Sequence, residues 1–105
     1  MVEVYYNPSS YIVKVDGHAK SGEYGHDLVC AAVSILVHTL IANVQYIESK
    51  SKEKSEISLT EGSAYILCKP LKEHENACRI IFNSVCVGFE LLANSYPENI
   101  SYKIV

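Results

Sequence analysis

Two pairs of short segments in which apolar and polar residues alternate place the strongest constraint on the fold. The first pair, VEVYYN (2–7) and SYIVKVDG (10–17), flanks the turn-rich tripeptide Asn7-Pro8-Ser9. The second pair, ISLT and SAYILCK, flanks Glu61-Gly62. Period-two alternation on both sides of a short turn is typical of a β-hairpin. We therefore expect two hairpins and a mainly antiparallel sheet.

A long apolar stretch follows the first hairpin. From Leu28 to about Ile47 the chain is apolar almost all round, although polar residues such as Ser34 and His38 interrupt it. A span of a bilayer needs about 20 apolar residues without such interruptions. We therefore expect a buried core helix and no membrane partner.

A second helix is predicted from about Leu71 to Ser95, where apolar residues recur at steps of four and three until Pro97 ends the pattern. The C-terminal ISYKIV predicts one more short edge strand. The order ββαββα(β) predicts an α+β fold, in which a mainly antiparallel sheet of four to five strands packs against two helices. We expect one domain over residues 1–105.

The composition excludes several classes of function. With 9 Lys and Arg against 12 Asp and Glu, the chain has no basic stripe that could neutralise several phosphates, so we expect no direct nucleic-acid partner. The four cysteines lie in apolar sequence without CxxC spacing, which predicts reduced thiols in the cytoplasm, no metal site and no cofactor. The N-terminus lacks the basic region of a signal peptide.

The stretch DGHAKSGEYGHDLVC (16–30) carries the candidate chemistry. If Asp27 is the N-cap of the first helix, Cys30 is the third helical residue, and the helix dipole favours its thiolate form. The unsatisfied backbone N–H groups of the same turn could then face a developing oxyanion. Cys30 is therefore the cysteine placed to be reactive.

A thiolate nucleophile also needs a base, and two histidines precede Cys30. We favour His18, at the end of a strand, over His26, which adjoins the cap and can face solvent. Asp27 either caps the helix or also orients an imidazole. The alternative is that Cys30 is a small buried hydrophobe and Asp27 only a cap.

One helical stripe extends the candidate site beyond the cysteine. Cys30, Ser34 and His38 stand at i, i+4 and i+8, so they share one face of the predicted helix. His38 lining the site is therefore a weaker alternative that the spacing leaves open.

At DGHA, GEYGHD and LVCAAVS, the chain resembles the bacterial ribosomal-processing cysteine protease family, Prp. The His of GHA and the Cys of LVCA correspond to His18 and Cys30, twelve residues apart. The resemblance extends over the whole chain. It implies a small α+β homodimer in which a Cys–His dyad removes a short N-terminal extension from the large-subunit ribosomal protein L-twenty-seven.

Carried over to this chain, the resemblance makes Cys30 the nucleophile, His18 the general base and acid, and Asp27 the acidic residue beside them. The loop from Ala19 to His26 becomes a flap over the substrate. The residues expected to bind substrate are Gly17, Ala19, Gly22, Gly25, His26 and Ser34.

Two other functions remain open at this point. The chain could be a non-enzymatic dimeric module that binds a ribosomal partner and uses GHAKSGEYGHD only as a recognition loop. A metal site made by Cys30, His18 and His26 would lack a fourth nearby ligand.

Overall fold

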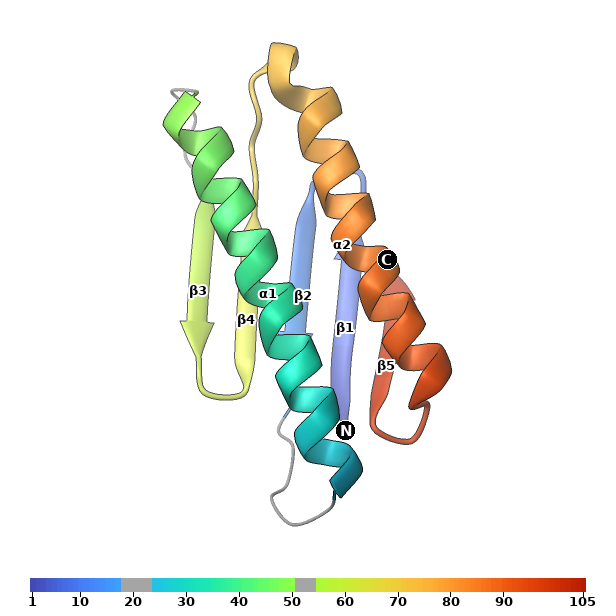
Figure 1. The fold of residues 1–105 in the computed structure, drawn as a ribbon. Helices are drawn as coiled ribbons and strands as arrows, with labels where there is room; N and C mark the ends of the chain where they lie inside the picture. The colour runs from blue at the N-terminus through green and yellow to red at the C-terminus, as the bar shows by residue number, and fades with distance from the viewer. Residues whose placement is uncertain (18–23, 51–54) are drawn as a thin grey trace.

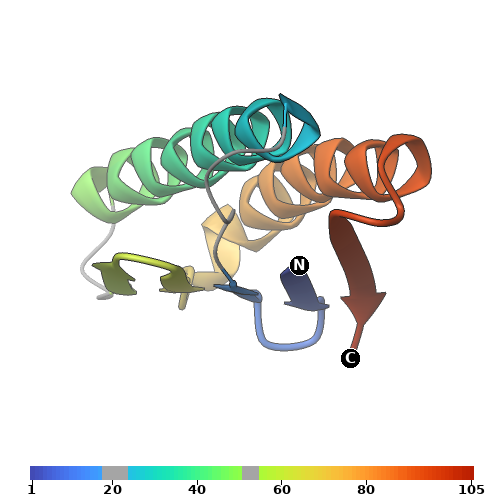
Figure 2. The ribbon, with the colours of Figure 1, turned by 90° about the horizontal axis from the view of Figure 1, so that it is seen from below.

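A computed structural model describes residues 1–17, 24–50 and 55–105, without the side chains of 24–27 and 49–50. Both helices lie on the same face of a single sheet, so the molecule has two layers (Figures 1 and 2). The predicted α+β fold and its order of elements are confirmed. The elements are β1 (Val2–Asn7), β2 (Ile12–Asp16), α1 (Tyr24–Lys50), β3 (Glu56–Thr60), β4 (Ser63–Leu67), the 3-10 turn η1 (Lys72–His74), α2 (Glu75–Ser95) and β5 (Ile100–Ile104).

The sheet has five strands in the order β3-β4-β2-β1-β5. Neighbouring strands pair antiparallel, except that β5 runs parallel to β1, with Val2 opposite Ile100. The mainly antiparallel sheet is therefore confirmed, and the C-terminal segment is an edge strand as expected. Its parallel direction follows from α2, which returns the chain to the end of the sheet where β1 starts (Figure 1).

The core lies between the sheet and the two helices, because the pleat of each inner strand turns alternate apolar side chains toward α1 and α2. On β1 and β2 the buried residues are Val2, Val4, Tyr6, Val13 and Val15. The inner face of α1 contributes Val29, Val33, Val37, Leu40, Val44 and Ile47. The inner face of α2 contributes Cys78, Phe82, Val85, Cys86 and Phe89.

Three predicted boundaries are wrong, and one of them is the start of the second helix, because α2 begins at Glu75 and not at about Leu71. The first hairpin turn continues to Tyr11, which has a φ of 53°, so β2 starts at Ile12 and not at residue 10. The Oδ1 atom of Asn7 accepts hydrogen bonds from the backbone N–H groups of Ser9 and Ser10, at 3.0 and 3.3 Å, and stabilises this longer turn. The first helix starts at Tyr24 and not at Leu28.

Both helices are long and apolar enough to cross a membrane, judged by length and composition alone, over Leu28–Glu48 and Lys72–Ser95. Each of them nevertheless packs one apolar face on the sheet, as a core helix does.

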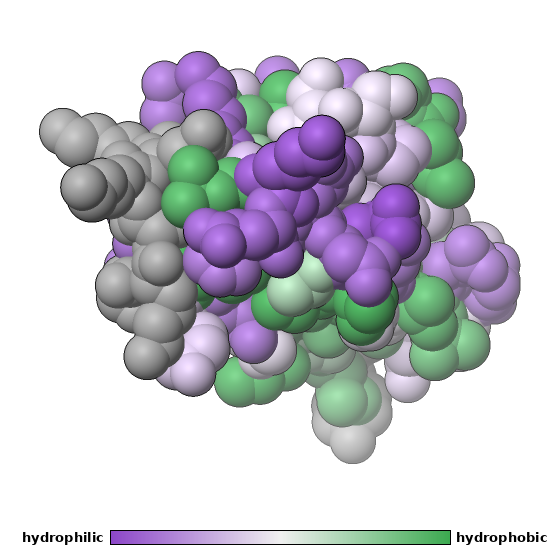
Figure 3. All heavy atoms as spheres, turned by 90° about the horizontal axis from the view of Figure 1, so that it is seen from above, coloured by the Kyte–Doolittle hydropathy of each residue, from purple (hydrophilic) through white to green (hydrophobic). Residues whose placement is uncertain are grey.

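At the end of the molecule where α2 begins, hydrophilic side chains gather over the centre (Figure 3).

Alkaline conditions should weaken the core. Burial raises the pKa of Cys86 to about 12, from an ordinary value of 9.0, and raises the pKa of Tyr6 to about 12. The fold thus favours the protonated groups, so their contribution to stability is complete below about pH 9 and is lost as the pH rises through 12. Urea unfolding at a series of pH values should show the free energy of unfolding falling across this interval. Cys86→Ala should show a smaller fall, and an equal fall in the variant would contradict the assignment.

Candidate active site

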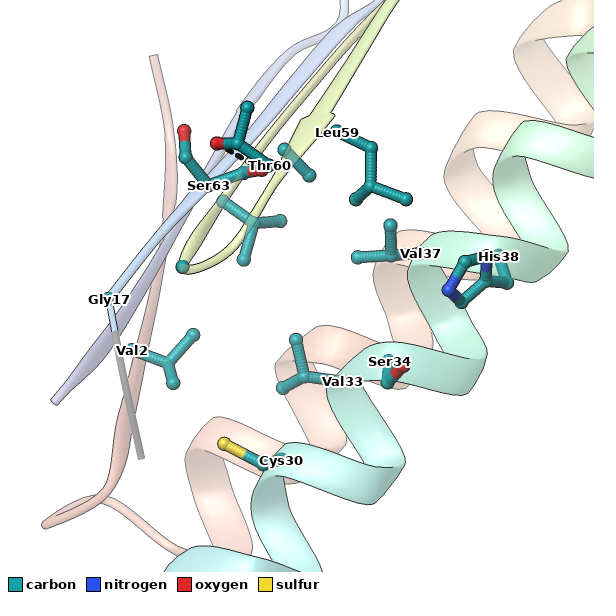
Figure 4. A pocket seen from close by; sticks show the side chains of 13 residues that line it. Val2, Gly17, Cys30, Val33, Ser34, Val37, His38, Leu59, Thr60 and Ser63 are labelled. Atoms are coloured by element: carbon teal, nitrogen blue, oxygen red, sulfur yellow. Dashed lines mark hydrogen bonds between the residues drawn. The ribbon is translucent and has the colours of Figure 1, made fainter. Parts of the chain in front are cut away.

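A pocket of about 150 Å³ lies between α1 and the end of the sheet where β2 finishes and the β3–β4 hairpin turns (Figure 4). Its wall is mostly apolar. It is lined by Val2, Val15, Gly17, Cys30, Val33, Ser34, Val37, His38, Leu59, Thr60, Gly62, Ser63 and Ala64. No Asp, Glu, Lys or Arg side chain is among these described residues.

The helical wall of the pocket carries the stripe that the spacing predicts. Cys30, Ser34 and His38 all line the pocket from α1 (Figure 4). Cys30 is half-buried, packs against the core, and points its sulfur from the helix toward the sheet. A thiol in this position is held by packing and is still reachable from the pocket.

The opposite wall is fixed where β2 ends. The N–H of Gly17 donates to the carbonyl of Gly62 at 2.9 Å, and the Ser63 hydroxyl donates to Oδ1 of Asp16 at 3.1 Å. These two bonds tie the end of β2 to the turn of the next hairpin. The backbone at Gly17, directly before residue 18 in the chain, is therefore held in place at the pocket wall.

Gly17 is required at this point by its conformation. Its φ is +125°, a value that L side chains rarely adopt, and a Cβ atom there would lie 2.3 Å from the carbonyl oxygen of Met1. The same Cβ would lie 3.0 Å from the Cα of Val2. Only glycine thus lets β2 end beside β1 in this geometry.

The prediction that Asp27 is an N-cap is wrong. Because α1 starts at Tyr24, Asp27 is in its first turns and Cys30 is the seventh helical residue, beyond the four N–H groups that a helix start leaves unsatisfied. The dipole effect is largely confined to the first turn, so the argument that it activates Cys30 does not hold. One glycine costs a helix only about 1 kcal/mol, so Gly25 does not stop α1 from starting early.

The structure brings only part of the predicted site together. Gly17, Cys30 and Ser34 meet at the pocket. Gly25 and His26 belong to the first turn of α1, so the flap predicted from Ala19 to His26 cannot extend through residues 24–26. The remaining candidates, His18, Ala19 and Gly22, lie outside the described residues.

The sequence does not predict that the second hairpin contributes residues to the pocket. Leu59, Thr60, Gly62 and Ser63 line the pocket, and the Thr60 hydroxyl donates to the carbonyl of Ser63 at 3.5 Å within the turn (Figure 4). The sequence predicts the hairpin itself. It carries no signal that this turn lines the same pocket as Cys30, because that follows from the pairing of β4 with β2.

The other three cysteines are buried, as predicted for packing residues. Cys68, Cys78 and Cys86 are exposed by 4%, 0% and 2%. Hydrogen bonding to Cys68 and burial raise the pKa of the Cys78 thiol. Within the described part of the chain, no group of three or more His, Cys, Asp and Glu residues could hold a metal ion.

Alkylation should therefore distinguish Cys30 from the other thiols. We expect iodoacetamide at neutral pH to add one carbamidomethyl group per folded chain, at Cys30, because the other thiols are inaccessible. Peptide mapping by mass spectrometry locates the adduct. Equal early labelling of Cys86 would show that the core opens faster than the burial implies.

Comparison with known proteins shows which family this chain is similar to. The family described as cysteine protease Prp matches residues 1–101. The ribosomal processing cysteine protease Prp of Staphylococcus aureus is 30% identical over 88 residues, which are 84% of this chain and 80% of that protein.

Solved structures agree with the sequence match. A crystal structure of the essential protease Prp from S. aureus with a substrate peptide has a TM-score of 0.71 at 26% identity, covering 100% of both chains. Another, with a covalently linked product peptide, has a TM-score of 0.68 at 28% identity, covering 99% of this chain and 97% of that one. The resemblance predicted from the motifs is thereby confirmed, and the chain belongs to the cysteine protease Prp family.

Proposed function

We propose that this protease removes the N-terminal extension of the bacterial large-subunit ribosomal protein L-twenty-seven by means of a Cys30–His18 dyad. The observation that carries the proposal is that Cys30 lies half-buried in a pocket whose other wall ends at Gly17, directly before His18 in the chain. The names of the S. aureus relatives support ribosomal processing, and a covalently linked product peptide supports covalent chemistry in that relative.

In the proposed reaction, the Cys30 thiolate attacks the scissile carbonyl carbon, and the C–N bond of the tetrahedral intermediate breaks. His18 gives its proton to the departing amine. Water then attacks the thioester as His18 takes its proton, and the C–S bond of the second tetrahedral intermediate breaks. This releases the carboxylic acid product and restores the Cys30 thiolate beside a protonated His18. Asp27 is three residues before Cys30 on α1, one helical turn away, and we propose that it orients His18.

The pocket also indicates the substrate side chain beside the scissile bond. Val15, Val33, Val37 and Ala64 give it a mainly apolar wall, so the part of the pocket nearest Cys30 suits an apolar side chain. Gly17 and Ser34 would contact the substrate within the pocket. We propose that Ala19, Gly22, Gly25 and His26 contribute to substrate binding from the segment before Cys30.

We propose that the enzyme is a homodimer that works in the cytoplasm, where thiols stay reduced. The outer face of α1, away from the sheet, exposes Leu28, Ile35 and Tyr46 by 47%, 63% and 66%, and no charged residue occurs from 28 to 47. The outer face of α2 exposes Ile80, Val87 and Leu91 by 57%, 55% and 61%. A second copy that packs its own helices on this layer would remove both apolar stripes from water.

A charge placed in this layer should separate the copies. Val87→Glu is expected to shift sedimentation equilibrium toward the monomer, because burying an unpaired carboxylate at the interface is costly. Ser9→Glu, which adds the same charge in the exposed turn between β1 and β2, is the control. A Val87→Glu protein that stays dimeric would show that the interface lies elsewhere.

The cleavage itself is tested with a peptide that spans the extension and the start of the mature protein. Mass analysis should find two products from one cut. Binding without products would instead support the non-enzymatic module. No interaction at all would exclude this peptide as a substrate.

A further inference from the structure

His38 is a pocket residue that the proposed reaction does not use. It stands eight residues after Cys30 on the same stripe of α1 and lines the same pocket (Figure 4). At 1.5 Å per residue, the two positions are about 12 Å apart along the helix. An extended peptide lying along α1 would advance about 3.3 Å per residue, so this separation would equal three to four substrate residues.

The surroundings of His38 suit a polar contact. Its ring is exposed and forms no hydrogen bond with the described residues, whereas the neighbouring Thr39 hydroxyl already donates to the carbonyl of Ile35 at 2.6 Å. Leu59 and Thr60 form the wall across the pocket. The imidazole N–H is thus an available donor at the edge of an otherwise mainly apolar surface.

We infer that His38 determines specificity by donating a hydrogen bond to an acceptor side chain of the substrate, an amide or a carboxylate, three or four residues from the scissile bond. The inference rests on the proposed function. It concerns a substrate residue that the Cys30–His18 dyad does not select. A peptide with an apolar residue at that position covers the imidazole and leaves its N–H without a partner. One such hydrogen bond corresponds to about tenfold in kcat/KM.

The test uses peptides that share one scissile bond and carry either Gln or Leu at one of four positions, three or four residues before or after it. Wild-type enzyme is expected to prefer Gln about tenfold at one of these positions, through KM and not kcat. His38→Leu should remove this preference, and His38→Gln, which keeps a donor, should retain most of it. Gln45→Leu, the same kind of change seven residues further along α1 and outside the pocket lining, should leave it unaltered.

The outcomes separate the two proposals. If wild-type enzyme cuts none of the peptides, the proposed function fails and this inference fails with it. If it cuts them but His38→Leu shows the wild-type preference, with an unchanged melting temperature, only the role of His38 is overturned.

Discussion

Cys30→Ala should lower kcat/KM for the extension peptide by at least about 1,000-fold, because the enzyme then has no atom that can form the thioester. The melting temperature should hardly change, since Cys30 is only half-buried and the substitution removes one sulfur from the pocket wall. Product formation by mass spectrometry and thermal unfolding measure the two effects. More than a few per cent of wild-type activity would remove Cys30 from the proposed mechanism.

Cys86→Ala provides the matched control for this substitution. Cys86 is 2% exposed in the inner face of α2 and lies outside the pocket lining, so its loss leaves a small cavity in the core. We expect a loss of about 1 to 2 kcal/mol in the free energy of unfolding and nearly full activity well below the melting temperature. The two cysteines should thus give opposite patterns of stability and activity.

Gly17→Ala should have the second large effect, lowering the free energy of unfolding by about 2 to 3 kcal/mol and kcat/KM by more than tenfold. The added Cβ would overlap the Met1 carbonyl at 2.3 Å, while the Val2 N–H, held by the carbonyl of Asn99 at 2.9 Å, keeps β1 from moving aside. Relief of the overlap must therefore displace the end of β2, which leads into His18. Chemical denaturation and steady-state kinetics measure both losses.

Gly62→Ala separates this effect from the general cost of replacing a turn glycine. Gly62 has a φ of 77°, but no neighbouring atom of the described residues would closely contact an added Cβ. Its substitution should cost about 1 to 2 kcal/mol through backbone strain. The Gly62 carbonyl can still accept the N–H of Gly17, so the end of β2 should stay in place. Equal loss of activity in both variants would show that the hairpin turn, and not Gly17, sets the position of the end of β2.

The elements of this fold are predictable because their signals are local. Alternation around Asn7 and around Gly62 is enough to place both hairpins, and the steps of three and four from Cys78 to Phe89 place the inner face of α2. The start of α1 is not predictable in this way. Gly22 and Gly25 are typical of a loop, whereas a long helix extends over one glycine because each added residue gains a hydrogen bond.

The site was predictable only where its residues share one segment. Cys30, Ser34 and His38 lie on one helix, so their common face follows from helical spacing. Thr60 and Ser63 join them through strand pairing, since the partner and register of β4 depend on the packing of the whole sheet. The N-cap assignment of Asp27 failed for a related reason, because a polar residue before an apolar run looks the same whether the helix starts there or a turn earlier.

The pairing of β1 with β5 makes the pocket depend on both ends of the described chain. Val2 lines the pocket, and its place in the sheet is secured by Ile100, the residue opposite it on β5. A ribosome makes Cys30 long before it makes Ile100. A nascent chain that stops short of β5 thus carries the thiol before the strand that pairs with Val2 at the pocket wall has been made.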